Sequence, residues 1–182
     1  MKIFLSLACI ALFAFTSCKT PEARKPVSTN SGTYTRSIEM NKKRYANEEK
    51  DIIKMMDADT IDYKTSAYGF WYYYNKSNPL ATDMPDPGEL VEFQYNVKDL
   101  HGNTIYTTEE LGAHTYIMDK EELFTGLREG LKLMREGETV TFVFPSYKAY
   151  GYYGDLKRIG TNMPIITTVT VNDIKPSNIV EP

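Results

Sequence analysis

Four tyrosines stand close together within residues 142–155, which read FVFPSYKAYGYYGD. A short apolar stretch ends at Pro145, and two glycines follow among the aromatic residues. A tyrosine side chain combines a large apolar ring with one hydroxyl that can donate or accept a hydrogen bond. The segment therefore either packs a core or lines a binding site that is mostly apolar with a few polar groups.

The sequence has few residues in patterns that perform nucleophilic or metal chemistry. Its two histidines are His101, in the tight turn LHGN, and His114, at the start of a predicted strand. Neither histidine belongs to a sequence pattern that is typical of a site with a nucleophilic serine or cysteine. CxxC and HxxxH spacings are absent from the sequence, and so is a glycine-rich phosphate loop after a strand. Hydrolysis, metal catalysis and nucleotide chemistry are disfavoured, no cofactor is expected, and the net charge of −3 does not indicate a nucleic-acid surface.

Three segments, taken in order, resemble the FKBP family of peptidyl-prolyl cis/trans isomerases. Residues 126–138 (GLREGLKLMREGE) match the family's helix pattern of glycine, leucine, methionine and a further glycine. Residues 144–151 contain the Phe-Pro and Ala-Tyr-Gly parts of the strand-to-loop signature, and residues 159–162 match the return to the last strand. The resemblance extends over about residues 65–176, and the first hairpin also matches in spacing, with Tyr95 and the turn DLHGNTIY.

The reaction that this resemblance implies explains why acids, bases and nucleophiles are missing. Rotation about an X-Pro bond needs none of them, because its barrier of about 18–20 kcal/mol comes from amide resonance. The twisted amide is less dipolar than the planar one, so an apolar pocket disfavours the ground state more than the transition state. Hydrogen bonds that fit only the twisted geometry add to this effect.

The resemblance also implies which side chains form the pocket. The tyrosines at the catalytic positions are Tyr150, Tyr95 and Tyr106, and the Tyr150 hydroxyl corresponds to the donor to the bound peptide carbonyl. The substrate-binding positions are Ile105, Leu123, Phe124, Leu127, Ile159 and Thr167. Core packing is the alternative for every one of these residues, and both roles are compatible for Leu123 and Leu127.

Three other tyrosines lie near the expected pocket. Tyr152 and Tyr153 follow Tyr150 and are expected to extend the rim, whereas Tyr147 is expected to be structural.

Three positions depart from the family pattern. Tyr106 replaces an aspartate, Leu127 replaces a tryptophan at the pocket floor, and Thr167 replaces an aromatic residue. Leu127 in place of tryptophan makes the floor of the expected pocket smaller, and Tyr106 in place of aspartate changes one polar group of the pocket. These departures favour an alternative function, a binding or chaperone module of FKBP shape with little isomerase activity, as part of an envelope complex.

The elements that must position these residues are strands and one clear helix. Alternating apolar residues predict strands in residues 66–76, a hairpin in 89–108, and strands in 114–119, 138–145 and 164–174. Residues 120–136 predict a helix, with Leu123, Leu127, Leu131 and Met134 on one face and Gly137 as its C-cap. The fold class is therefore α+β, and the resemblance makes it an antiparallel sheet wrapped around one central helix.

The N-terminal residues predict an exported lipoprotein. Residues 1–17 form a signal peptide, with Lys2 before an apolar run too short to span a bilayer. Cys18 follows small residues as in a bacterial lipobox and is the expected lipidation site. Lipidation also accounts for an unpaired thiol in an exported protein.

Three further segments follow the signal peptide. Residues 18–37 are rich in Pro, Ser and Thr and predict a flexible tether. Residues 38–63 predict a short helical extension with Asn47 as N-cap, and it either docks on the domain or serves as a dimerisation arm. Residues 64–178 form the expected isomerase domain.

This organisation resembles that of the gliding-motility-associated isomerase lipoproteins. We therefore expect a lipid-anchored, periplasm-facing isomerase of the cell envelope that assists the folding of exported proteins. The expected partners are proline-containing exported polypeptides and, through the N-terminal lipid, a membrane, but no nucleic acid. The oligomeric state, the client and the membrane involved stay open.

Overall fold

The computed structural model describes residues 31–81 and 83–176 of the 182-residue chain. The predicted signal peptide, Cys18 and most of the predicted tether lie outside the described residues. The contacts divide the chain into two units, residues 1–38 and 39–182. Everything below concerns the second unit, apart from the bounds of helix α2.

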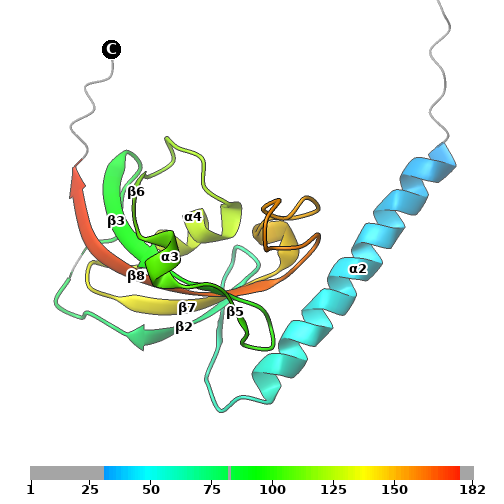
Figure 1. Cartoon of the computed structure of the whole chain (residues 1–182), viewed down its shortest axis with the longest axis horizontal. Coiled ribbons are helices and arrows are strands. Elements are labelled where there is room, and N and C mark those ends of the chain that lie inside the picture. Colours follow the sequence, from blue (N-terminus) through cyan, green and yellow to red (C-terminus); the bar gives the residue numbers. More distant parts are fainter. Residues whose placement is uncertain (1–30, 82, 177–182) are drawn as a thin grey trace, which may run out of the picture. The chain divides into compact units, whose positions relative to one another are not determined.

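An antiparallel sheet makes up most of this unit, with strand order β1-β2-β7-β8-β3-β6 and a short β4–β5 hairpin beside it. The strands are β1 (Lys64–Thr65), β2 (Trp71–Lys76), β3 (Glu89–Tyr95), β4 (Val97–Lys98), β5 (Thr104–Tyr106), β6 (Ala113–Ile117), β7 (Thr139–Phe144) and β8 (Ile165–Pro176). Figure 1 shows the sheet curving around helix α4 (Thr125–Leu131). The predicted α+β class, an antiparallel sheet wrapped around one central helix, is confirmed.

The strands form where apolar residues alternate, because successive side chains of a strand point to opposite faces. In β3, Val91, Phe93 and Tyr95 are buried while the residues between them are partly exposed. The same alternation in β8 buries Ile165, Thr167 and Val169. A one-residue shift would reverse both patterns, so burial determines the register of the two paired strands.

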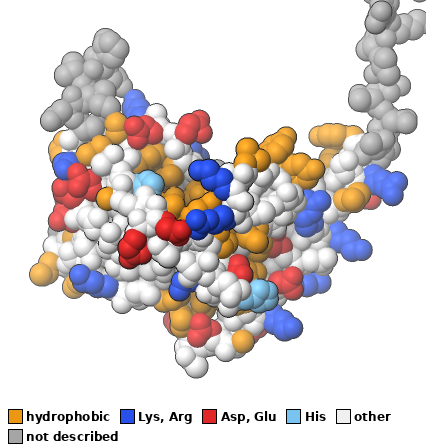
Figure 2. Space-filling view, in the orientation of Figure 1, with side chains coloured by type: hydrophobic (Ala, Val, Ile, Leu, Met, Phe, Trp, Pro, Cys, Tyr) orange, Lys and Arg blue, Asp and Glu red, His pale blue; other side chains and the backbone are white. Residues whose placement is uncertain are grey.

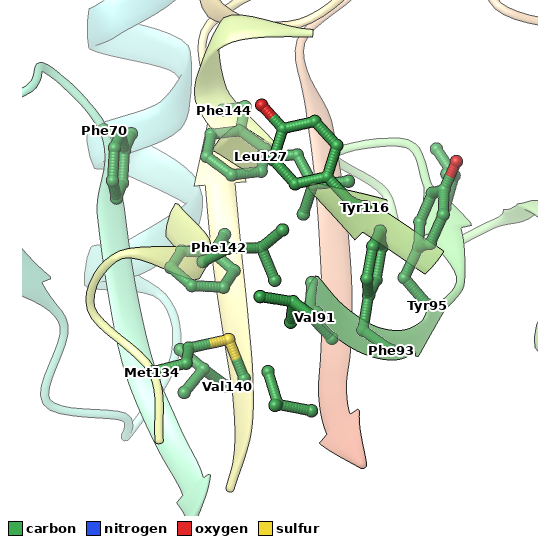
Figure 3. Close-up of a cluster of buried hydrophobic side chains, with 14 of the residues drawn as sticks. Phe70, Val91, Phe93, Tyr95, Tyr116, Leu127, Met134, Val140, Phe142 and Phe144 are labelled. Carbon is green, nitrogen blue, oxygen red and sulfur yellow. The ribbon is translucent and has the colours of Figure 1, made fainter. Parts of the chain in front are cut away.

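Aromatic rings fill the core on the inner face of the sheet. Phe142 and Phe144 stack with centroids 5.3 Å apart, and Phe70 packs edge-on to Phe144 at 5.2 Å. Figure 3 shows these rings on one side of the cluster and Phe93 and Tyr95 on the other. Phe70, which directly precedes β2, is fully buried in this core.

Helix α4 is much shorter than the predicted helix of residues 120–136. It ends at Leu131, after which Leu133 and Met134 donate to carbonyls three residues back, as in a tightening turn. The apolar repeat continued to Met134 because that side chain is still buried, although the backbone there is no longer helical. Gly137 is not the C-cap: it has φ +76° in the turn before β7, and its N–H donates to the carbonyl of Val171.

Helix α2 (Ser31–Asp57) is longer than predicted. It begins inside the segment that we expected to be a tether, and it continues through Asn47, which is therefore not an N-cap. Its first half lacks the apolar periodicity that predicts a helix, and this is why the start was missed. In its second half, Glu48 and Ile52 are buried on one face, as docking on the domain requires.

Two short helices complete the described structure. They are α3 (Thr108–Leu111), which begins with a capping box between Thr107 and Glu110, and the 3-10 helix η2 (Ser146–Lys148). No helix in the described part of the chain is long and apolar enough to cross a membrane. Within the same residues, no group of three or more His, Cys, Asp or Glu side chains could hold a metal ion.

Candidate functional site

The predicted pocket residues meet at one end of the aromatic core. Tyr95 comes from β3, Phe124 and Leu127 from the start of α4, Tyr150 from the segment after η2, and Ile159 from the return to β8. All belong to one contiguous hydrophobic cluster. Residues that are far apart in the sequence are thus brought together as the resemblance implied.

Tyr150 lies at the centre of this group. Its ring is 5.0 Å from that of Phe124, and its hydroxyl hydrogen-bonds the hydroxyl of Tyr95. Burial, then the nearby Tyr95, raise the pKa of Tyr150 well above its usual value of about 10. The hydroxyl therefore stays protonated and available as a hydrogen-bond donor.

Tyr95 is almost completely buried, with 6% of its surface exposed. Its ring stacks on Phe93 and lies 5.1 Å from the ring of His114. Burial raises the pKa of Tyr95, and the hydrogen bond from Tyr150 opposes that shift. Because so little of Tyr95 reaches the surface, its main role in this arrangement is to orient the Tyr150 hydroxyl.

Tyr106, which replaces the family's aspartate, has an acidic partner from another segment. Its hydroxyl donates to the carboxylate of Asp155. This hydrogen bond, followed by burial, raises the pKa of Tyr106. The acidic partner of Tyr106 thus comes from the loop that follows Tyr150.

Asp155 is held by backbone groups as well as by Tyr106. Its Oδ1 accepts from the N–H groups of Lys157 and Ile159, at 2.9 and 2.8 Å. Burial raises the pKa of Asp155, but the hydrogen bonds from Tyr106 and from the backbone outweigh it and lower the pKa overall. Asp155 is therefore an ionised acceptor that links the loop to β5.

Arg158 adds a second link between the same two segments. Its guanidinium lies 4.8 Å from the centre of the Tyr106 ring, and its Nη1 donates to the carbonyl of Ile105 at 2.8 Å. It also forms an ion pair with Glu110 at 2.9 Å. Asp155 and Arg158 were not among the predicted site residues, although both lie between Tyr150 and Ile159 in the sequence.

Leu127 and Thr167 lie in the interior of the domain. Both are fully buried, and Ile159 retains only 3% exposure. Thr167 is paired in the sheet with Phe142, and its Oγ1 has no hydrogen-bond partner among the described residues. Both side chains therefore pack in the core, as the alternative reading of these two residues expects.

The remaining predicted residues line the exposed side of the cluster. Ile105, Leu123 and Phe124 are partly buried and pack against it. Tyr152 and Tyr153 are 65% and 77% exposed and form an edge-on ring pair, which places them on the surface. Figure 2 shows hydrophobic side chains gathered on this face over the loop that follows η2, beside acidic and basic ones.

Two glycines allow the loop after Tyr150 to turn back over the hydrophobic cluster. Gly151 and Gly154 have φ values of +61° and +65°, which other residues rarely adopt. A Cβ on Gly154 would lie 2.1 Å from the carbonyl oxygen of Ile159. This close approach returns the chain toward β8 and places Ile159 beside Tyr150 in the cluster.

Comparison with known families gives one match over this region. The model for the FKBP-type peptidyl-prolyl cis-trans isomerase matches residues 82–172, which include every predicted pocket residue. A curated relative from Neisseria meningitidis serogroup B, named "probable FKBP-type peptidyl-prolyl cis-trans isomerase FkpA", is 26% identical over 106 residues. The match covers 58% of this chain and 38% of that relative, so the chain spans well under half of the relative's length.

Two solved structures show the same fold. A peptidyl-prolyl cis-trans isomerase from Pseudomonas syringae pv. tomato is 19% identical with a TM-score of 0.59, covering 74% of this chain and 95% of that one. FkpA from Escherichia coli is 21% identical with a TM-score of 0.60, covering 97% of this chain and 83% of that one. The family model matches half of the chain and the solved structures share its fold, so the chain belongs to the FKBP-type peptidyl-prolyl cis-trans isomerase family.

Proposed function

We propose that this protein catalyses the cis/trans isomerisation of X-Pro bonds in polypeptides at the cluster around Tyr150. The observation that carries the proposal is the Tyr150 hydroxyl, a donor that burial keeps protonated, beside an apolar surface formed by Phe124, Leu123 and Ile159. This arrangement supplies a hydrogen bond and a poorly solvated site. Both favour a twisted amide over a planar one.

In this mechanism Tyr150 exchanges partners when a peptide binds. Its hydroxyl leaves Tyr95 and donates to a carbonyl of the bound chain, while the proline ring packs against the aromatic and aliphatic side chains. A hydrogen bond that is about 1 kcal/mol stronger in the transition state accelerates rotation about fivefold. The remaining acceleration comes from the apolar surroundings and from orientation of the peptide.

A refolding assay tests the proposed activity. The substrate is an unfolded protein whose slow phase is limited by a proline, and the full chain is added in catalytic amounts. We expect the slow phase to accelerate, and we expect Tyr150→Phe to lose most of that acceleration, whereas Tyr68→Phe, at an exposed position away from the site, retains it. An unchanged slow phase with the wild-type chain would exclude the isomerase function.

We also propose that the protein works in the cell envelope on exported polypeptides, anchored through a lipid on Cys18. The support is the signal-like N-terminus and the lipobox-like residues before Cys18. Incorporation of labelled palmitate should be lost in Cys18→Ala, and equal labelling of both proteins would contradict the anchor.

The likeness to gliding-motility-associated isomerase lipoproteins extends this proposal to that process. Its support is the order of signal, tether, helix and isomerase domain along the chain. Deleting the gene in the bacterium that encodes it should impair gliding, and normal gliding of the deletion strain would contradict the link.

A second candidate function is a chaperone that binds unfolded chains with little isomerase activity. The exposed apolar residues Tyr152, Tyr153 and Leu156, with 65%, 77% and 86% exposure, favour it, since they could contact a flexible client beside the pocket. In the same refolding assay, reduced aggregation without acceleration of the slow phase would support this candidate and exclude the first.

A further inference from the structure

A buried carboxylate of helix α2 contacts the start of the loop that carries Tyr150. Glu48 is only 8% exposed, and Ser146 is fully buried. Both oxygens of Glu48 accept from Ser146: Oε1 from its backbone N–H, and Oε2 from its hydroxyl at 2.7 Å. A buried carboxylate is tolerated only where it is well hydrogen-bonded, so this pair is a specific connection between α2 and η2.

Two more side chains of α2 contact the same loop. The ring of Tyr45 packs on that of Tyr147 with centroids 4.9 Å apart. Arg44 donates from Nη1 to Oδ1 of Asn162 at 3.1 Å, near the far end of the loop. Because Arg44, Tyr45 and Glu48 lie within about one turn of helix, one face of α2 reaches both ends of the loop.

The residues that α2 contacts also hydrogen-bond the residue next to Tyr150. The N–H of Gly151 donates to the carbonyl of Ser146 at 2.8 Å, and the N–H of Asn162 donates to the carbonyl of Gly151 at 2.8 Å. Gly151 is thus held from both sides by residues that α2 contacts directly. A shift of Ser146 or Asn162 would be transmitted to Gly151, and from there to the position of the Tyr150 hydroxyl.

Helix α4 limits the loop from the opposite side. A Cβ on Gly126 would lie 2.8 Å from the carbonyl oxygen of Lys148 and 2.6 Å from Cδ1 of Phe144, so α4 and η2 are in close contact. With α4 on one side and α2 on the other, η2 has little freedom to move. The three contacts from α2 lie outside the pocket, since Arg44, Tyr45 and Glu48 are not members of the hydrophobic cluster.

We propose that α2 is a positioning element of the pocket, in which Glu48, with Tyr45 and Arg44, fixes the loop so that the Tyr150 hydroxyl points at the bound peptide. This inference rests on the proposed function. It assigns a role in the isomerase site to a helix that lies outside residues 82–172, the part matched by the family model. Glu48 is a positioning residue because it acts through Ser146 and Gly151 without touching a substrate.

The test uses the full chain and three substitutions of neighbouring acids. Glu48→Ala removes both hydrogen bonds to Ser146. Glu48→Gln has nearly the same shape and can still accept from the Ser146 N–H and donate to its hydroxyl. Glu49→Ala makes the same charge change at an exposed position one residue away and serves as the control.

Isomerisation of a proline-containing peptide and amide hydrogen exchange are measured at a temperature at which all variants are folded. We expect Glu48→Ala to lower kcat up to about fivefold with little change in KM, because the donor to the transition state is misplaced. Glu48→Gln should recover most of kcat, and Glu49→Ala should match wild type. Exchange should become faster at the amides of Gly151 and Asn162 in Glu48→Ala, but not at those of β3.

A folded Glu48→Ala protein with wild-type kcat and wild-type exchange at Gly151 would overturn the inference. If Glu48→Ala does not fold, Arg44→Ala, which removes only the contact to Asn162, decides by the same two readouts. If the wild-type chain shows no isomerase activity, the proposed function fails, whereas the exchange measurement still decides whether α2 fixes the loop.

Discussion

At the level of single residues, the pocket works with hydroxyls and apolar side chains and not with acids and bases. The hydroxyls of Tyr95, Tyr150 and Tyr106 are each engaged in a hydrogen bond, and the carboxylate of Asp155 accepts one of them. The resemblance to the family pointed to the three tyrosines, and their catalytic roles stay a prediction. Asp155 was not predicted, because no periodicity in the sequence indicates that this loop carboxylate accepts from Tyr106.

The pair of Tyr106 and Asp155 leads to a prediction for activity. Tyr106→Phe removes one hydrogen bond between β5 and the loop, and we expect kcat/KM to fall about two- to tenfold, as for the loss of one such bond. Asp155→Asn should have a larger effect, because Asp155 also accepts from Lys157 and Ile159. The double variant should be little worse than Asp155→Asn alone, since the two groups act together.

Peptide isomerisation kinetics on the four proteins check this prediction, with Tyr68→Phe, at an exposed position away from the site, as the control. Strictly additive losses would show that the two groups act independently, and wild-type kcat/KM in Asp155→Asn would show that Asp155 does not contribute to the site.

The raised pKa of Tyr150 leads to a prediction for the dependence on pH. An ordinary tyrosine is half ionised at about pH 10, but Tyr150 remains protonated there because its pKa is raised. Activity that depends on this hydroxyl should therefore not decline between about pH 8 and pH 10. The contribution of the raised pKa to stability is likewise present below about pH 10 and is lost as the pH rises further.

A pH profile of kcat/KM for wild type and Tyr150→Phe measures this. If the difference between the two proteins disappears with a midpoint well below pH 10, the hydroxyl ionises too early to act as the proposed donor.

At the level of elements, periodicity predicted the strands well and the helices poorly. The alternation in β3 and β8 corresponds directly to burial, because each strand has one face in the core. Helix α4 was predicted too long, since Met134 continues the apolar repeat from a turn and not from a helix. The buried face of α2 depends on Glu48, an acid, and a buried acid gives no apolar signal in the sequence.

The close packing of α4 against β7 and η2 leads to a prediction for stability. An alanine at Gly126 places a methyl group 2.6 Å from Cδ1 of Phe144 and 2.8 Å from a backbone oxygen. Overpacking of this kind costs about 1–3 kcal/mol, and the better helix propensity of alanine offsets about 1 kcal/mol of that cost. Because both contacts are below 3.0 Å and one is with backbone, the cost lies at the upper end of that range, and we expect Gly126→Ala to be less stable than wild type by about 2 kcal/mol.

Urea unfolding of Gly126→Ala measures this change, with Gly160→Ala as the matched control, since a Cβ there has no atom within 4 Å. A Gly126→Ala protein as stable as wild type would mean that α4 packs less closely on η2 than described.

At the level of the whole molecule, residues 39–182 form one unit in which α2 and the isomerase fold contribute to the same loop. The family match begins at residue 82, so α2, β1 and β2 lie before it. The contacts of Glu48 and Arg44 with Ser146 and Asn162 connect this earlier part of the chain to the pocket. Neither contact could be predicted from the sequence, because both join residues separated by about a hundred positions.

The most direct test of the account is the rate of cis/trans exchange of a short proline-containing peptide, measured by NMR with catalytic amounts of the full chain. A short peptide cannot aggregate or misfold as a protein client does, so the measurement reports isomerisation alone. Uncatalysed exchange takes tens to hundreds of seconds. We predict clearly faster exchange with wild type and a large loss of that acceleration with Tyr150→Phe; a peptide that binds at the pocket but exchanges at the uncatalysed rate would contradict the account.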